Sequence, residues 1–160
     1  MRKVIIIGGG LAGLITSIQL ARAGISCAVI EKKSYPFHRV CGEYVSNEAR
    51  PFLKASGLYP NEFNLPQIKF FEFSSVKGKS ARIGLDLGGF GISRYSFENF
   101  LFGIAQREGV DFQLGTEASA INYDGEDFVV EGPFGELSSD LVIGCFGKRS
   151  RIDVQQNRSF

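Results

Sequence analysis

The chain has 160 residues, of which 44% are apolar and 12% aromatic, and this length and composition suit one globular domain with a sizeable core. Its 18 basic and 17 acidic residues are well mixed, which argues against nucleic acid or a charged membrane surface as a partner, and no apolar run is long enough to span a membrane. The three cysteines, Cys27, Cys41 and Cys145, are odd in number and widely spaced, which disfavours disulfides and a metal cage; with no room for a signal peptide before the first strand, we expect a cytoplasmic protein.

Residues 1–31 predict a strand, a helix and a second strand around a glycine-rich turn. The apolar run Lys3–Ile7 leads into the pattern Gly8-x-Gly10-x-x-Gly13. A helix is predicted from Leu11, because apolar residues recur at the i, i+3, i+4, i+7 spacing before a glycine stop. A second apolar run, Ser26–Ile30, ends at Glu31. This order is typical of a dinucleotide-binding unit.

Each glycine of the pattern has an expected mechanical role. Gly8 permits the tight turn out of the strand, Gly10 lets a diphosphate approach the backbone, and Gly13 lets the helix lie close to the sheet. The first helical N–H groups, those of Leu11 and Ala12, lie at the positive end of the helix dipole. We therefore expect the diphosphate to bind there.

Glu31 lies about 20 residues after the glycines, where an acid accepts hydrogen bonds from a ribose and repels a 2′-phosphate, so FAD or NAD is favoured over NADP. Residues 32–43 show neither the helix nor the strand period and should form a loop at the carboxyl edge of the sheet, where ligands bind. The charges of Lys32, Lys33 and Arg39 could contact phosphates or the adenosine, or could form a solvated basic rim. We favour the first role for Arg39 and the second for the lysines, and we keep Lys32 among the cofactor candidates.

Two further residues of this loop have open interpretations. His38, the only histidine, is interpreted as a structural or surface residue, since no catalytic partner can be named for it. Cys41 could donate a proton or sense redox state if it is exposed and its pKa is lowered by Arg39, or it could be a small filler. Cys27 and Cys145 lie inside apolar runs and are expected in the core.

The middle of the chain predicts a second, smaller sheet. Ser46 should cap a short helical turn, and Pro51–Ser56 should form another that stops at Gly57. The phenylalanine-rich segment 68–75 and the alternating segment 80–87 predict an antiparallel pair that turns at residues 77–79. The glycine-rich segment 87–95 is expected to be flexible.

The last part of the chain predicts a helix, a meander and a final strand. Ser96 should cap an amphipathic helix whose apolar stripe belongs to the core. Strands are predicted at 111–114, 118–123 and 127–131, and the run 141–147 predicts another buried parallel strand. The whole order predicts an α/β fold: a three-layer, Rossmann-like dinucleotide-binding domain with an antiparallel meander.

This order resembles the flavoprotein group that includes p-hydroxybenzoate hydroxylase and the geranylgeranyl reductases, over nearly the whole chain. In that group an N-terminal unit ends in an acid, as Val4–Glu31 does here. The resemblance implies FAD as cofactor and a flavin-contacting arginine in the following loop, here Arg39. It also places the pair Cys41-Gly42 near the isoalloxazine ring, as in reductase-like members.

The resemblance continues into the second half. It implies a cofactor contact for Arg94 and a backbone contact with adenine near Ala118. Residues 140–150, which include Gly147, resemble the middle fingerprint of the group. Phe146 departs from that fingerprint, because the group usually has aspartate there, so any role of that carboxylate is in doubt.

The chain also stops before the third fingerprint of the group, a Gly-Asp pair. The resemblance therefore implies an N-terminal portion of a longer enzyme: an FAD-type binding domain over residues 1–160, incomplete at its C-terminus, with the start of a substrate-domain sheet inserted at residues 66–92.

An FAD-dependent oxidoreductase is the leading interpretation of function, since a flavin needs binding and orientation from the protein and no catalytic triad. Hydroxylation and saturation of a double bond both remain open; the Cys41-Gly42 pair favours the reductase-like branch, with Cys41 as the catalytic candidate. The 15 phenylalanines suit a small apolar or aromatic organic substrate, or cover by further segments of a longer chain, and NAD(P)H or another donor would supply electrons. The alternatives are a non-catalytic dinucleotide-binding fragment and an NAD-dependent dehydrogenase.

Overall fold

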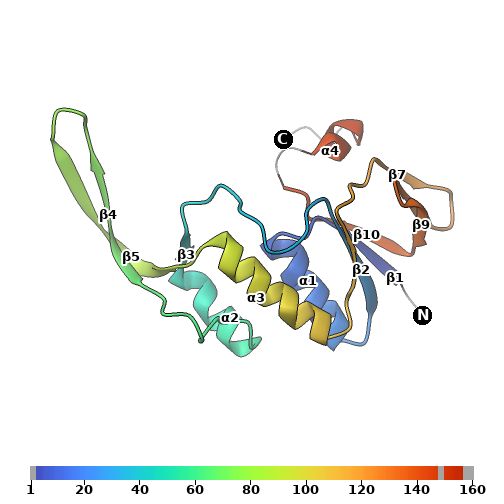
Figure 1. Cartoon of the computed structure of the whole chain (residues 1–160), viewed down its shortest axis with the longest axis horizontal. Helices are drawn as coiled ribbons and strands as arrows, with labels where there is room; N and C mark the ends of the chain where they lie inside the picture. Colours follow the sequence, from blue (N-terminus) through green and yellow to red (C-terminus); the bar gives the residue numbers. More distant parts are fainter. Residues whose placement is uncertain (1–2, 148–149, 157–160) are drawn as a thin grey trace. The chain divides into compact units, whose positions relative to one another are not determined.

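The computed structural model describes residues 3–147 and 150–156. The chain divides into two compact units, Met1–Phe37 with Glu98–Phe160, and His38–Phe97. Figure 1 shows the elements of both units in chain order. The first unit contains the parallel sheet and the second contains a small antiparallel sheet, so each is described by itself below.

A four-stranded parallel sheet forms the centre of the first unit, in the order β10-β1-β2-β6. Its strands are β1 (Lys3–Ile7), β2 (Ser26–Glu31), β6 (Asp111–Leu114) and β10 (Leu141–Gly144). The two central strands are buried almost throughout, as their continuous apolar runs predicted. The prediction that β10 is a parallel strand is confirmed. The prediction that it is buried is wrong, because β10 is an edge strand and Leu141 is 48% exposed.

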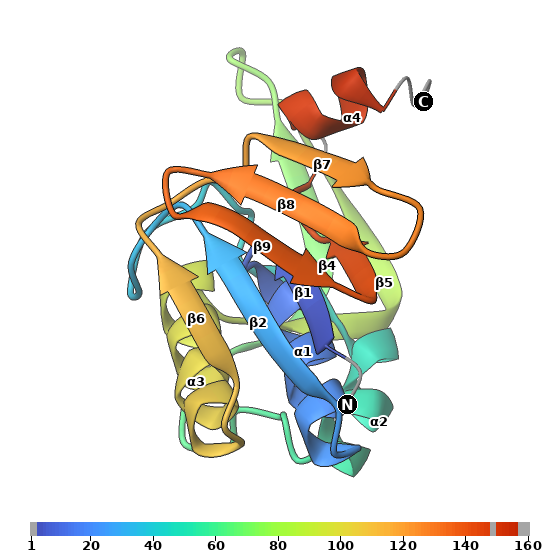
Figure 2. The same ribbon diagram turned by 90° about the vertical axis from the view of Figure 1, so that its right-hand side faces the viewer.

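Two helices cover one face of this sheet (Figure 2). The first is α1 (Leu11–Arg22), which buries Leu14 and Ile18; the second is the Glu98–Arg107 part of α3 (Arg94–Arg107), which buries Leu101 and Ala105. Both helices end at a glycine with positive φ, Gly24 and Gly109 respectively.

A three-stranded meander covers the other face of the sheet (Figure 2). It consists of β7 (Ala120–Tyr123), β8 (Phe128–Gly132) and β9 (Gly135–Ser139), followed after β10 by the short helix α4 (Arg151–Gln155). Buried side chains of β1, β2, β8, α4 and the segment before β7 form the apolar layer between sheet and meander: Ile5, Ile7, Ile30, Ala118, Val130 and Ile152. Helices, sheet and meander thus form the three-layer α/β fold expected from the sequence.

The second unit is built on a sheet in the order β3-β5-β4. Its elements are β3 (Tyr44–Ser46), the 3-10 turn η1 (Asn47–Ala49), α2 (Arg50–Ala55), β4 (Gln67–Ser74) and β5 (Ser80–Gly91). The hairpin predicted from the alternating pattern is confirmed, and it extends as a long ribbon beyond β3 and α2 (Figure 1). Ser46 caps η1 as predicted, because its Oγ accepts a hydrogen bond from the Glu48 N–H at 3.3 Å.

Two predictions about this unit are wrong. Residues 87–91 were expected to be flexible, but they continue β5, where Val45 pairs with the fully buried Phe90. A Cβ on Gly89 would lie 2.3 Å from the Tyr44 ring, so glycine serves close packing here rather than flexibility.

The cap of α3 is Ser93 and not Ser96. The Ser93 Oγ accepts from the Ser96 N–H at 3.1 Å, and the Ser93 carbonyl accepts from the Phe97 N–H at 3.0 Å. The helix therefore starts at Arg94, and Ser96 lies in its first turn.

Candidate functional site

The glycine-rich turn lies at the carboxyl end of β1, and its shape requires glycine at two positions. Gly8 has φ +104°, and a Cβ there would lie 2.4 Å from the Cys145 carbonyl oxygen at the end of β10. A Cβ on Gly13 would lie 1.9 Å from the Gly8 carbonyl oxygen. The turn is therefore pressed between β10 and α1, as the predicted roles of these two glycines require.

The start of α1 is left open to a ligand by its own sequence. Gly10 is the N-cap and offers no side-chain hydrogen bond, and no acidic residue lies in the first turn. The first intrahelical bond runs from the Leu14 N–H to the Gly10 carbonyl at 2.9 Å, so the N–H groups of Leu11, Ala12 and Gly13 have no acceptor within the helix. An uncapped positive helix end of this kind favours an anionic group such as a diphosphate.

Glu31 ends β2 and turns its carboxylate toward the glycine turn. Its side chain is 3% exposed; Oε2 accepts from the Gly9 N–H at 2.8 Å and Oε1 accepts from the Lys33 N–H at 3.1 Å. These two bonds to backbone N–H groups fix the orientation of the carboxylate beside the turn. The acid predicted from spacing is thus in contact with the predicted turn.

Tyr35 is a residue of this site that the sequence reasoning missed. Its hydroxyl donates a hydrogen bond to the Gly9 carbonyl, and its ring stacks on Phe102 with centroids 4.3 Å apart. A Cβ on Gly9 would lie 2.1 Å from that hydroxyl, so close packing against Tyr35 favours glycine at this position too. Gly9 is held from both sides, by Glu31 at its N–H and by Tyr35 at its carbonyl. The only signal in the sequence was a glycine at the variable position of the pattern.

The segment before the meander lies beside the end of β2. The Thr116 N–H donates to the Glu31 carbonyl at 3.3 Å, and Ala118, which is 4% exposed, packs in the same apolar cluster as Ile30. The structure therefore brings Glu31, the glycine turn and Ala118 together at the carboxyl edge of the parallel sheet. In open α/β sheets this edge is where ligands bind.

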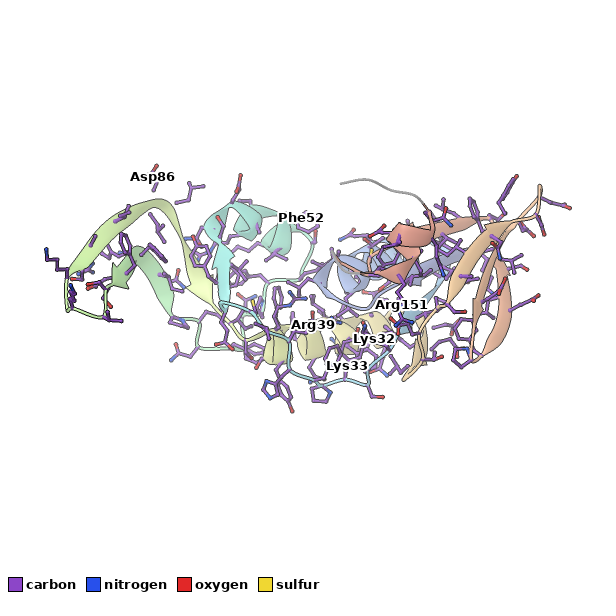
Figure 3. All side chains as sticks on the ribbon, turned by 90° about the horizontal axis from the view of Figure 1, so that it is seen from above. Lys32, Lys33, Arg39, Phe52, Asp86 and Arg151 are labelled. Atoms are coloured by element: carbon purple, nitrogen blue, oxygen red, sulfur yellow. The ribbon has the colours of Figure 1, made fainter. Side chains whose placement is uncertain are left out.

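The two lysines that follow β2, Lys32 and Lys33, are labelled in Figure 3, and both are exposed. Lys32 Nζ lies 3.3 Å from Glu117 Oε1, with side chains 56% and 70% exposed, and Lys33 Nζ lies 5.2 Å from the centre of the Phe37 ring. An exposed ion pair of this kind contributes little to stability. Both lysines agree with a solvated rim, and the cofactor role of Lys32 stays a prediction.

The end of β10 carries the segment likened to a middle fingerprint. Phe146, at the position of the usual aspartate, packs against the apolar cluster between sheet and meander, and Gly147 follows with φ +78°. Lys148 and Arg149 lie outside the described residues. Ser150 caps α4, since its Oγ accepts from the Ile152 N–H at 3.1 Å. Burial raises the pKa of the Cys145 thiol, which makes that cysteine a poor nucleophile.

The remaining candidates belong to the second unit. Cys41 is exposed, and its Sγ accepts from the N–H of Glu43, a residue with the rare positive φ of 53°. The His38 ring stacks on Tyr95 with centroids 4.6 Å apart. Arg94 is the first residue of α3. Roles for these residues, for Arg39 and for Gly42 stay predictions, because the structure describes the two units separately.

Within residues 3–147 and 150–156, no group of His, Cys, Asp or Glu side chains is placed to hold a metal ion. No helix among these residues is long and apolar enough to cross a membrane.

The geometry of the first unit fits an adenine dinucleotide: a turn where side chains would clash, an uncapped helix start and an oriented carboxylate lie at one edge of the sheet. Comparisons with solved structures agree on the fold. A Diels-Alderase, PyrE3, superposes with a TM-score of 0.83 at 19% identity over 98% of this chain and 35% of its own. The halogenase PltM in complex with phloroglucinol and FAD superposes with a TM-score of 0.81 at 18% identity, over 98% of this chain and 36% of its own.

Sequence comparisons agree as well. Violacein synthase of Chromobacterium violaceum is 24% identical over 95% of this chain and 40% of that protein, and tryptophan 2-halogenase of Chondromyces crocatus is 24% identical over 98% and 32%. The chain thus spans less than half the length of these relatives. The family model described as FAD binding domain matches residues 1–159. The chain therefore belongs to the FAD binding domain family, and its cofactor is FAD.

Proposed function

We propose that this chain is the cofactor-binding part of an FAD-dependent oxidoreductase that acts on a small organic substrate. The observation that carries the proposal is the glycine turn held by Glu31 and Tyr35 beside the uncapped start of α1, in a chain of the FAD binding domain family. Bound FAD would supply the hydride and oxygen chemistry, and the protein would bind and orient it.

In this proposal the residues of the first unit divide the cofactor between them. The N–H groups of Leu11, Ala12 and Gly13 receive the diphosphate, Glu31 accepts from the ribose hydroxyls, and the backbone at Ala118 contacts adenine. Arg39, Gly42 and Arg94 of the second unit contact the flavin side, as the family resemblance implied. Each of these roles can be tested by mutating the residue and measuring FAD affinity.

Two branches of chemistry remain, and the names of the relatives favour the one that uses oxygen. They include tryptophan 2-halogenase and, among solved structures, p-nitrophenol 4-monooxygenase PnpA from Pseudomonas putida, with a TM-score of 0.77 at 20% identity over 96% of this chain and 43% of its own. The reductase-like branch rests on Cys41-Gly42 alone and is our second choice. NAD(P)H as electron donor, an apolar or aromatic substrate and a cytoplasmic location are further proposals.

A non-catalytic FAD-binding fragment is the second candidate function. The chain spans 40% of violacein synthase, and a protein named as a Diels-Alderase has the same fold, so the fold alone does not require redox turnover.

Titration of the purified chain with FAD, followed by flavin fluorescence, tests the proposal. We expect FAD to bind and NAD to bind far more weakly. Glu31→Gln should weaken FAD binding about tenfold, because charged acceptors make the stronger hydrogen bonds. Glu126→Gln, in the exposed turn before β8, is the matched control. Equal affinity of the two variants, or a preference for NAD, would contradict the assignment.

A further inference from the structure

The loop 38–43 of the second unit is attached near both of its ends to the segment around the start of α3. At its end, the Glu43 carbonyl accepts a hydrogen bond from the Ile92 N–H at 3.0 Å. At its beginning, the ring of His38 stacks on that of Tyr95, with centroids 4.6 Å apart and an angle of 26° between the planes. The loop contains no helix or strand, so its course depends on contacts such as these two.

The middle of the loop faces solvent between these attachments. Val40 is 109% exposed, Cys41 is exposed, and a Cβ on Gly42 would meet nothing within 4 Å. Few buried contacts are typical of segments that open easily. These three residues therefore give the loop little packing that would order it, and the attachments at its ends matter more.

The aromatic stack joins the immediate neighbours of two arginines. His38 precedes Arg39, which Figure 3 labels, and Tyr95 follows Arg94, the first residue of α3. The start of α3 is itself fixed, because Ser93 caps it. Stacking of His38 on Tyr95 therefore fixes the backbone of the loop relative to the first turn of the helix.

We propose that His38 and Tyr95 are positioning residues for the flavin half of FAD. Their stack holds the loop that carries Arg39 and Gly42 beside the start of α3, which carries Arg94, before the cofactor binds. A loop that is held in advance loses less conformational entropy on binding, so affinity is higher. This role rests on the proposed function, in which the two arginines and the glycine contact the flavin side.

Calorimetric titration of the full chain with FAD and with ADP tests the role of the stack. ADP carries the diphosphate and the ribose of the adenosine half but no flavin. His38→Ala and Tyr95→Ala should each weaken FAD binding about fivefold, the worth of one aromatic pair, and leave ADP affinity unchanged. His38 is exposed and Tyr95 is 37% exposed, so neither truncation empties a core site. Unchanged FAD affinity, or equal losses for FAD and ADP, would overturn the proposal.

Conservative variants separate stacking from the other properties of the two side chains. His38→Phe and Tyr95→Phe keep a pair of stacked rings and should bind FAD as the native chain does. The double variant His38→Ala/Tyr95→Ala should lose no more affinity than either single variant, because each of these already removes the pair. Additive losses, or a loss in His38→Phe as large as in His38→Ala, refute the stack as the cause.

Phe71→Ala is the matched control within the same unit. It removes another ring pair, that of Phe71 and Phe73 in the hairpin, whose centroids lie 6.0 Å apart, and it should leave FAD affinity unchanged. A loss in Phe71→Ala equal to that in His38→Ala would contradict a specific role of the stack.

The native chain separates this role from the proposed function. If it does not bind FAD, the proposed function fails, and the role of the stack fails with it. If it binds FAD no more tightly than ADP, the diphosphate site stands, but the flavin half adds nothing that the stack could position, and the role of the stack alone is overturned.

Discussion

At the scale of single residues, the glycine turn depends on two side chains that approach Gly9 from opposite sides. Glu31 accepts from its N–H, and the hydroxyl of Tyr35 donates to its carbonyl. Glu31 was expected from spacing, because the length of a βαβ unit fixes where the second strand ends. Tyr35 was not, because its position depends on stacking with Phe102, which is distant in sequence. Local sequence rules therefore predict the position of Glu31, whereas tertiary packing decides that of Tyr35.

Replacing Tyr35 by Phe tests the role of that hydroxyl. The ring keeps its stacking on Phe102 while the bond to Gly9 is lost, so FAD affinity should fall about fivefold, the worth of roughly one hydrogen bond. Tyr123→Phe is a matched control, since the Tyr123 hydroxyl also donates to a glycine carbonyl, that of Gly125, at 3.0 Å. Fluorescence titration with FAD measures both. Equal loss in the two variants would show that Tyr35 does not position the turn.

The buried thiol of Cys27 gives the first unit a pH dependence. Burial raises its pKa above the ordinary value of 9.0, and the carboxylate of Asp111 raises it further. Above about pH 9 the unfolded thiol loses its proton while the folded thiol keeps it, so the unfolded state binds fewer protons and stability falls as pH rises.

Urea unfolding at about pH 8 and about pH 10, on either side of the ordinary thiol pKa, measures the effect. The free energy of unfolding of the native protein should fall more between these values than that of Cys27→Ala. Cys41→Ala, at an exposed position, should follow the native protein. The idea fails if Cys27→Ala and the native protein lose stability in parallel.

At the scale of elements, sequence patterns predicted strands and helices well where the pattern and the burial are both local. β1, α1 and β2 begin and end at the expected residues, since an apolar run, a 3.6 period and a glycine stop lie next to one another. Residues 87–91 were misjudged because their strand state depends on β3, a segment distant in sequence. Glycine content predicted flexibility there, whereas pairing with β3 gives order.

The cap of α3 provides a direct test at this scale. Ser93→Ala removes the acceptor for the Ser96 N–H and should lower the free energy of unfolding by about 1 kcal/mol. Ser96→Ala should cost less than about 0.5 kcal/mol, because alanine is the better residue inside a helix. Denaturant unfolding of the two variants compares them. A larger loss of unfolding free energy in Ser96→Ala than in Ser93→Ala would support Ser96 as the helix cap, as predicted from the sequence.

At the scale of the whole molecule, the sequence predicted the fold class and the meeting of the glycine turn with Glu31 at one edge of the parallel sheet, but not the pocket between β4 and β5 of the second unit. Alternating β and α patterns leave few arrangements for a parallel sheet, and its carboxyl edge follows from topology. The pocket at Arg50 arises from an irregular register between two strands, which no periodicity in the sequence indicates. Topology is thus readable from pattern, and local irregularity is not.

The phenylalanines divide between the core and the surface of the protein. Phe90 is fully buried in the second unit, whereas Phe71, in the hairpin of the same unit, is 55% exposed. Phe90→Ala should therefore cost about 3–5 kcal/mol, the value for emptying a well-packed aromatic site, and Phe71→Ala less than about 1 kcal/mol.

Denaturant unfolding, monitored by NMR signals of the second unit, measures the free energy of unfolding of both variants. Both residues belong to this unit, so the two values refer to the same cooperative transition. A cost for Phe71→Ala as large as that for Phe90→Ala would mean that the hairpin face is covered in solution. A small cost means that its aromatic surface is available to another partner, because side chains that already contact water lose little when truncated.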